Sequence, residues 1–100
     1  MLCYAIMSEE APAALEKRLA VRPAHLARLT ELRDQGRLLL AGPHPMVDCE
    51  DPGEAGYSGS LIVARFDSLG EAEAWAAKDP YVTAGVYASV RVKPLRKVLP

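Results

Sequence analysis

The chain has 100 residues, of which half are hydrophobic and a quarter charged, and its net charge is −1. This length is typical of one domain, so we expect residues 1–100 to form a single domain with one core. A chain without a clustered basic excess is not typical of nucleic-acid binders. No segment approaches the roughly 20 apolar residues that a membrane helix needs. We therefore expect a globular domain that binds neither nucleic acid nor a membrane.

The N-terminal segment and the two cysteines indicate a cytoplasmic protein. The segment M-L-C-Y-A-I-M lacks the basic region and the cleavage site of a secretory signal. Cys3 lies in an apolar run and Cys49 in a polar loop, so the two do not suggest a disulfide framework. Free thiols fit a reducing compartment.

The first half of the chain predicts a strand, two helical segments and a second strand. Residues 2–7 form a short run with apolar side chains on both faces, which is typical of a sheet covered on both sides. A short helix is expected near residues 15–19. Proline disfavours helical geometry in the residue before it, so Arg22-Pro23 should interrupt this helix and begin a firmer one that ends at Gly36. Residues 37–42 then have the pattern of a buried strand.

The second half predicts a loop, a strand, a helix and a last strand. Residues 43–57 contain three prolines, two glycines and four acids, and therefore predict an irregular loop. The segment G-S-L-I-V-A-R-F predicts a strand, and Ser68 with Glu71 resembles a capping box for a helix that reaches about Lys78. In the last strand, alternation puts apolar residues on one face and Tyr87 with polar residues on the other. The apolar set is Val86, Ala88, Val90 and Val92.

The resulting order is β-α-β-β-α-β, which is that of a ferredoxin-like α+β fold with a four-stranded antiparallel sheet. Two helices cover only one face of such a sheet. Because the first and third strands have apolar residues on both faces, we expect a second copy of the chain to cover the other face in a two-fold homodimer. The alternative is that the 43–57 loop folds back over the sheet.

His25 is predicted to face the core. On a helix that begins at Pro23, His25 lies in the same stripe as Leu29 and Leu32, and Arg22, about 60° away, leans toward it. Buried polar side chains need partners, because leaving them unsatisfied is costly. The imidazole could bond a backbone carbonyl. Arg22 could either reach the surface or hold an anionic ligand.

Asp79, in the segment K-D-P-Y-V-T-A-G-V, is the residue whose chemistry best suits a partner for His25. It follows the second helix and precedes Pro80, so it could equally be a helix terminator whose carboxylate caps the next turn. If both helices start at the same end of the sheet, Asp79 lies opposite His25. The pairing then requires residues 80–85 to lead the chain back, or a second subunit to supply the carboxylate.

A second group of chemistry-bearing side chains falls in the predicted loop. It consists of His44, Asp48, Cys49 and Asp51. Their spacing matches no standard metal site, and two prolines flank the histidine, so a solvated acidic loop is the better interpretation and we expect no metal site. Trp75 lies among alanines and is expected to fill the core.

Four segments resemble the YciI-like, or YCII-related, family. They are R-P-A-H-L-A-R-L at 22–29, L-L-A-G-P at 39–43, G-S-L-I-V at 59–63 and K-D-P-Y-V-T-A-G-V at 78–86. They follow one another over essentially the whole chain, and the R-x-x-H and D-P-Y elements occur together at the right separation. The resemblance implies one YCII-related domain over residues 1–100, with a ferredoxin-like protomer in a dimeric α+β barrel.

The resemblance also implies a site and an activity. The family carries a histidine–aspartate pair in a cleft, which corresponds to His25 and Asp79. Lyase chemistry on chlorinated hydroquinone-type rings is known within the family and uses no metal or organic cofactor. We therefore expect a cofactor-independent lyase or isomerase acting on a small aromatic or carbonyl compound, with Arg22, Ser60 and Tyr81 as substrate contacts. The alternative is a dimeric module that binds a small molecule without turning it over.

Overall fold

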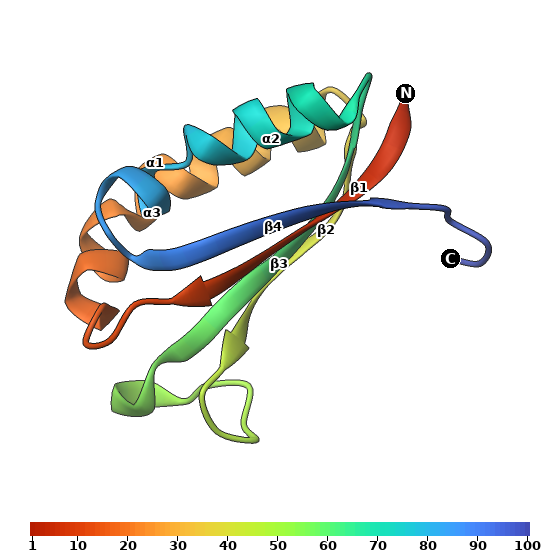
Figure 1. Ribbon diagram of the computed structural model, residues 1–100. Helices are drawn as coiled ribbons and strands as arrows, with labels where there is room; N and C mark the ends of the chain where they lie inside the picture. The colour runs from red at the N-terminus through yellow and green to blue at the C-terminus, as the bar shows by residue number, and fades with distance from the viewer.

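The computed structural model describes residues 1–100 as a four-stranded sheet with helices packed on one face (Figure 1). The strands are β1 (Leu2–Glu10), β2 (Leu38–Pro45), β3 (Tyr57–Phe66) and β4 (Tyr87–Leu95), in the spatial order β2-β3-β1-β4. The helices are α1 (Leu15–Asp34), α2 (Leu69–Ala77) and α3 (Pro80–Thr83), with a short 3-10 helix at Gly53–Ala55. All neighbouring strands are antiparallel. This arrangement confirms the predicted β-α-β-β-α-β order and the ferredoxin-like α+β fold.

The first helix is continuous, so the predicted interruption at Arg22-Pro23 is wrong. Helix α1 spans 20 residues and holds Pro23 in its interior. A proline there removes one helical hydrogen bond and crowds a carbonyl, at a cost of about 3 kcal/mol. The helix persists because its buried residues form one stripe that spans the proline. They are Arg18, His25, Leu29 and Leu32. No helix of the chain is both long and apolar enough to cross a membrane.

The two strands that flank the predicted loop are longer than expected. Strand β2 continues to Pro45, and β3 begins already at Tyr57. The prolines of β2 are tolerated because β2 is an edge strand, where a missing N–H removes no ladder bond on the open side. The loop between the strands lies at the end of the sheet beside the start of α1, where a Cβ on Gly56 would be 3.6 Å from Leu15 (Figure 1). It therefore does not cover the second face of the sheet.

A register shift between β1 and β4 changes which residues of β4 are buried. Ser89 pairs with Glu9, but the next pair joins Tyr87 to Glu10, so Ala88 is an extra residue. As a result Tyr87 is buried and Ala88 is exposed. Simple alternation predicts the opposite, with Ala88 on the apolar face and Tyr87 on the polar face. Alternation fails here because a bulge puts two residues of one strand opposite one residue of its neighbour.

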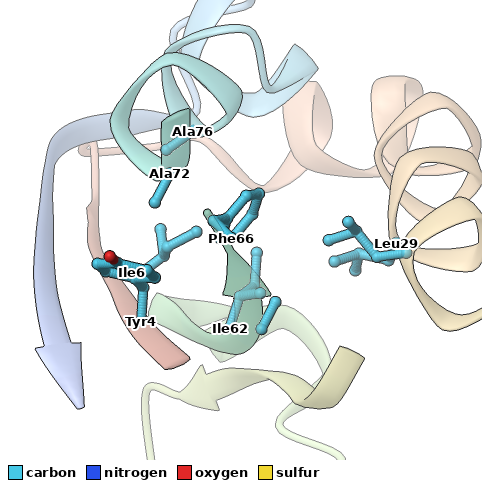
Figure 2. Packing of buried hydrophobic residues seen from close by; sticks show 9 residues of the cluster. Tyr4, Ile6, Leu29, Ile62, Phe66, Ala72 and Ala76 are labelled. Carbon is cyan, nitrogen blue, oxygen red and sulfur yellow. The ribbon is translucent and has the colours of Figure 1, made fainter. Parts of the chain in front are cut away.

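The main core lies between the sheet and the two helices. Figure 2 shows Phe66 of the sheet between Ala72 and Ala76 of α2 on one side and Leu29 of α1 on the other. The two alanines allow α2 to approach the sheet closely, and the larger side chains fill the remaining space. Burying a side chain such as Phe66 contributes roughly 1.5–3 kcal/mol. A smaller cluster at the other end of the helices consists of Ala14, Tyr81, Val86 and Tyr87.

The face of the sheet turned away from the helices is uncovered (Figure 1). Residues paired across antiparallel strands share a face. Cys3, Ala5 and Met7 of β1 therefore lie with Leu61 and Val63 of β3, on the opposite face from the core residues Ile6 and Ile62. Leu40, opposite Val63 on β2, is 50% exposed. Arg65, Arg91 and Lys93 lie on this face too, because they pair with Cys3, Met7 and Ala5. The apolar part of the face, defined by Ala5, Met7, Leu40, Leu61 and Val63, is referred to below as the open face.

Candidate functional site

A pocket of about 210 Å³ lies between α1 and the sheet. Its walls are largely apolar, and its polar lining residues are Arg18, Arg22, His25, Tyr57, Ser60 and Tyr81. Apolar walls with a few converging polar groups are typical of sites for small molecules. Four of the predicted site residues, Arg22, His25, Ser60 and Tyr81, therefore share one pocket, and the fifth, Asp79, lies behind His25.

His25 and Asp79 form a buried pair within one chain. Nδ1 of His25 lies 2.9 Å from Oδ1 and 2.9 Å from Oδ2 of Asp79. The two residues are only 7% and 3% exposed. Because Nδ1 faces the carboxylate, Nε2 is the ring nitrogen that remains for a ligand. The partner of the imidazole is thus a carboxylate of the same chain rather than a backbone carbonyl.

The direction of the helices explains why this pair forms without help from a long connection. Strands β1 and β3 are antiparallel, so the helices that follow them, α1 and α2, run in opposite directions. The expectation that both helices start at the same end of the sheet is therefore wrong. The C-terminal end of α2 lies beside the N-terminal half of α1, which brings Asp79 to His25.

Asp79 also caps the short helix α3. Its Oδ1 accepts a hydrogen bond of 2.9 Å from the backbone N–H of Tyr81, and Pro80 occupies the first helical position. Proline suits that position because its missing N–H would have no helical partner. The cap and the contact with His25 are thus two functions of one carboxylate, and the cap fixes the orientation in which the carboxylate meets the imidazole.

Tyr81 forms one wall of the pocket against the imidazole. The two rings are stacked, with centroids 3.9 Å apart and planes inclined by 15°. Burial raises the pKa of the Tyr81 phenol, although the nearby Arg18 opposes this effect. The phenol therefore stays neutral at physiological pH and keeps its proton as a donor. The stacking restrains rotation of the His25 ring.

Arg18 is the buried arginine of the pocket, and the sequence did not single it out. Its Nε and Nη2 each donate a hydrogen bond of 2.9 Å to the carboxylate of Glu10. Burial works against its charge, but Glu10 outweighs burial and the pKa of Arg18 is raised. The guanidinium also lies over the rings of Tyr57 and Tyr81, at 4.9 Å and 4.7 Å. Its positive charge is therefore held at the lining of the pocket.

Arg22 leans toward the stripe of His25, but it is exposed and lies at the rim of the pocket, so it reaches the surface. Its position at the edge of the buried stripe of α1 allows the long side chain to reach solvent. Arg18 precedes His25 by seven residues, which is two helical turns, and so lies near the middle of the same stripe. The spacing of Arg18 and His25 is visible in the sequence, but the predicted break at Pro23 assigned the two residues to different helices.

Three hydroxyl groups form a buried chain beside the pocket. Ser8 Oγ and Ser60 Oγ are 2.8 Å apart, and Ser60 Oγ is hydrogen-bonded to the hydroxyl of Tyr87. Burial raises the pKa of Tyr87, so its phenol remains protonated. Of the three residues, Ser60 lines the pocket. Neither Ser8 nor Tyr87 was predicted to belong to the site, since a strand pattern does not reveal which hydroxyls meet across a sheet.

The side chains considered as metal ligands do not converge. No group of three or more His, Cys, Asp or Glu side chains in the chain is placed to hold a metal ion. His44 and Cys49 are exposed, and the thiol of Cys49 contacts the carbonyl of Asp51. Trp75 packs against the core cluster, as expected.

The arrangement as a whole is suited to moving a proton on a bound molecule. The imidazole of His25 supplies a group that can accept and donate a proton. Arg18 supplies a fixed positive charge that can stabilise a negative oxygen of the bound molecule. The tyrosine rings form flat walls of the pocket. Nothing in such chemistry requires a redox centre.

Comparisons with known proteins agree with the fold. The family model of the YCII-related domain matches residues 2–96. Protein YciI of Escherichia coli O6:H1 is 59% identical over 97 residues, which are 97% of this chain and 99% of that protein. An uncharacterized protein of Haemophilus influenzae is 57% identical over 95 residues, which are 95% of this chain and 97% of that protein.

Among solved structures, the chain is similar to 5-chloro-2-hydroxyhydroquinone dehydrochlorinase (TftG) from Burkholderia phenoliruptrix AC1100, in its complex with 2,5-dihydroxybenzoquinone. The TM-score is 0.82, and the match covers 95% of this chain and 94% of that chain. Sequence identity is 23%. At this level of identity, the similarity shows a shared fold.

Proposed function

The chain belongs to the family of YCII-related domains, and from this premise we propose that it is an enzyme for a small hydroxylated ring compound. The proposed reaction is an elimination or an isomerisation in which His25 transfers the proton. The observation that carries the proposal is the buried contact of 2.9 Å between His25 and Asp79 beside a pocket of small-molecule size. A histidine with a purely structural role would not need to lie at the wall of such a pocket.

In the proposed mechanism His25 is first a base and then an acid. Its Nδ1–H donates to Asp79, so Nε2 carries the lone pair that accepts a proton from the substrate. The electron pair left on the substrate forms a new double bond, and the leaving group departs with the electrons of its own bond. The carboxylate of Asp79 stabilises the imidazolium formed in this step, and the proton is returned to the leaving group or to another substrate atom.

The proposed substrate class follows from the walls of the pocket. Tyr57 and Tyr81 offer flat surfaces, Arg18 offers a positive charge to an oxygen that becomes negative, and Arg22 lies at the rim. The related fold of a dehydrochlorinase that binds 2,5-dihydroxybenzoquinone supports a hydroxylated six-membered ring. Because elimination and isomerisation need only a proton transfer, we propose that no metal or organic cofactor takes part.

We also propose that the working form is a homodimer joined through the open face. That face is apolar, lies away from the pocket, and is covered by neither the helices nor the 46–56 loop. A second copy presents the same face, so a two-fold axis covers both at once.

The test is a turnover screen of chlorinated and unchlorinated hydroxyhydroquinones, lactones and enols with the wild type, His25→Ala and His44→Ala. We expect His25→Ala to lower the rate by about 10²–10⁴-fold, which is the usual contribution of general acid–base catalysis. The exposed His44 is the matched control and should leave the rate unchanged. Full activity of His25→Ala contradicts the mechanism. Binding without turnover by the wild type indicates the alternative, a module that binds a small molecule without converting it.

A further inference from the structure

Both buried basic groups of the pocket are backed by a carboxylate that lies outside the pocket. Arg18 is paired with Glu10, and the two side chains are each 6% exposed. His25 is paired with Asp79 in the same way. Arg18 and His25 line the pocket, whereas neither Glu10 nor Asp79 does. The lining by itself resembles an anion site, but the charges directly behind it have to be counted as well.

The charges of these four groups balance without a ligand. With both acids ionised, the four groups carry a total charge of −1 while His25 is neutral, and of zero when it is protonated. The total is never positive, so the buried groups hold no excess positive charge for an anion to neutralise. Arg22 is the remaining cation of the lining, but it is exposed at the rim, where solvent screens its charge.

Glu10 holds Arg18 by geometry as well as by charge. Nε and Nη2 of Arg18 donate to the two carboxylate oxygens at 2.9 Å, which is the bidentate arrangement that fixes a guanidinium most firmly. Nη2 also donates to the backbone oxygen of Gly59 at 3.5 Å. Arg18 is therefore held in place by the chain itself and needs no anionic ligand to do so.

We propose that Glu10 is a positioning residue through which the pocket selects an uncharged ring over one that carries a permanent negative charge. A carboxylate that enters the pocket loses its water and meets an Arg18 that is already neutralised, and a buried charge without a free partner is costly. A neutral hydroxylated ring avoids this cost. The proposal rests on the proposed function and deepens it by naming the charge of the substrate.

The proposed reaction is compatible with this balance of charges. When His25 takes a proton from a neutral substrate, the substrate becomes negative and the imidazole becomes positive. The total charge of the site with its substrate does not change in that step. A substrate that is an anion from the start adds a second negative charge beside the two carboxylates.

The experiment measures binding, not turnover, by NMR titration at neutral pH with 4-hydroxybenzamide and 4-hydroxybenzoate. The two probes have nearly the same shape and differ by one charge, because carboxylic acids titrate near ~4 and the benzoate is ionised. We expect the wild type to bind the benzamide at least about tenfold more tightly, since burying an unbalanced charge costs at least that factor.

Glu10→Gln is the decisive variant because it should create a new affinity. The amide keeps one oxygen for Arg18 and removes a negative charge, so binding of the benzoate should tighten about tenfold while the affinity for the benzamide changes less than about threefold. Glu10→Asp keeps the charge and should keep the preference of the wild type. Glu9→Gln, at the neighbouring exposed position of β1, is the matched control and should change neither affinity.

Asp79→Asn provides a second test that does not depend on Glu10. It removes the charge of the other acid, and its amide oxygen can still accept from the backbone N–H of Tyr81. Binding of the benzoate should therefore tighten in this variant too, by about tenfold.

Three outcomes overturn the proposal. They are a wild type that binds the benzoate as tightly as the benzamide, a wild type that binds neither probe, and variants of Glu10 and Asp79 in which the benzoate gains no affinity. A loss of affinity for both probes in Glu10→Gln reports that Glu10 only supports the fold. The preference is measured without catalysis, so an absence of turnover counts against the proposed enzymatic function alone.

Discussion

Asp79 makes two interactions, and a single substitution can keep one of them and change the other. Its Oδ1 caps the N–H of Tyr81, and the carboxylate accepts from Nδ1 of His25. In Asp79→Asn the amide oxygen can keep the cap, but the amide NH₂ then donates to Nδ1 and moves the ring proton to Nε2. We expect a rate loss on the order of 10²–10⁴-fold with little loss of stability. Nitrogen-15 NMR of the imidazole should report the exchanged tautomer.

Asp79→Ala is the matched comparison, because it removes both interactions. The lost cap costs about 1 kcal/mol, and an unpartnered buried imidazole adds about 1–3 kcal/mol. Urea denaturation should therefore rank the free energies of unfolding as wild type, then Asp79→Asn, then Asp79→Ala. An Asp79→Asn protein that keeps its rate and its Nδ1–H tautomer would show that the carboxylate does not orient the imidazole.

Gly59 is needed where β1 and β3 approach each other next to the hydroxyl chain. A Cβ at this position would lie 1.9 Å from the backbone oxygen of Ser8. Gly59→Ala should therefore lower the free energy of unfolding by about 1–3 kcal/mol, as overpacking does elsewhere. Gly42→Ala, where a Cβ would meet nothing within 4 Å, is the control in the same denaturation experiment. Equal losses in both variants would contradict the close-approach argument.

Part of the candidate site was predictable from the chemistry of individual residues in the sequence. His25 and Asp79 were predictable because a histidine in an apolar stripe demands a partner, and a carboxylate held by Pro80 is a suitable one. The identity of Arg18 as the buried arginine was not predicted, because the phase of its helix depends on whether Pro23 ends the helix. The Ser8–Ser60 contact joins residues 52 apart in the chain, and only strand register brings them together.

At the scale of elements, α1 depends on burial more than on helical propensity. Pro23 is exposed and lies inside the helix, where proline is less favourable than alanine by about 3 kcal/mol. Pro23→Ala should therefore raise the free energy of unfolding by up to that amount, as measured by urea denaturation. Ala24→Gly, at the next exposed position, should lower it by about 1 kcal/mol and serves as the control. A Pro23→Ala variant that is less stable would mean that the proline shapes α1 to fit the sheet.

The positions of helices and strands were predictable where residues close together in the sequence determine them. Ser68 accepts a hydrogen bond of 3.1 Å from the N–H of Glu71, so that half of the predicted capping box is confirmed and α2 starts where expected. The extra residue Ala88 was not predictable, because a bulge is a property of two paired strands. The direction of α2 relative to α1 likewise follows from the pairing of β1 with β3, which lies outside any local pattern.

At the scale of the whole molecule, the proposed homodimer rests on the open face. Its members would cover one another if two copies met sheet to sheet, and a stable interface of this kind buries about 800 Å² per partner. We therefore expect light scattering coupled to size exclusion to give twice the chain mass of 10.8 kDa for the wild type. A single buried charge removes much of the gain from such an apolar contact.

Leu61→Glu puts that charge on the open face, opposite Met7, and should shift the protein toward the monomer mass. Leu69→Glu is the control, because Leu69 is an exposed leucine at the start of α2 on the helical side, where an acid also suits the helix dipole. A wild type that elutes as a monomer would leave the apolar side chains of the open face in water and would contradict the sheet-to-sheet dimer.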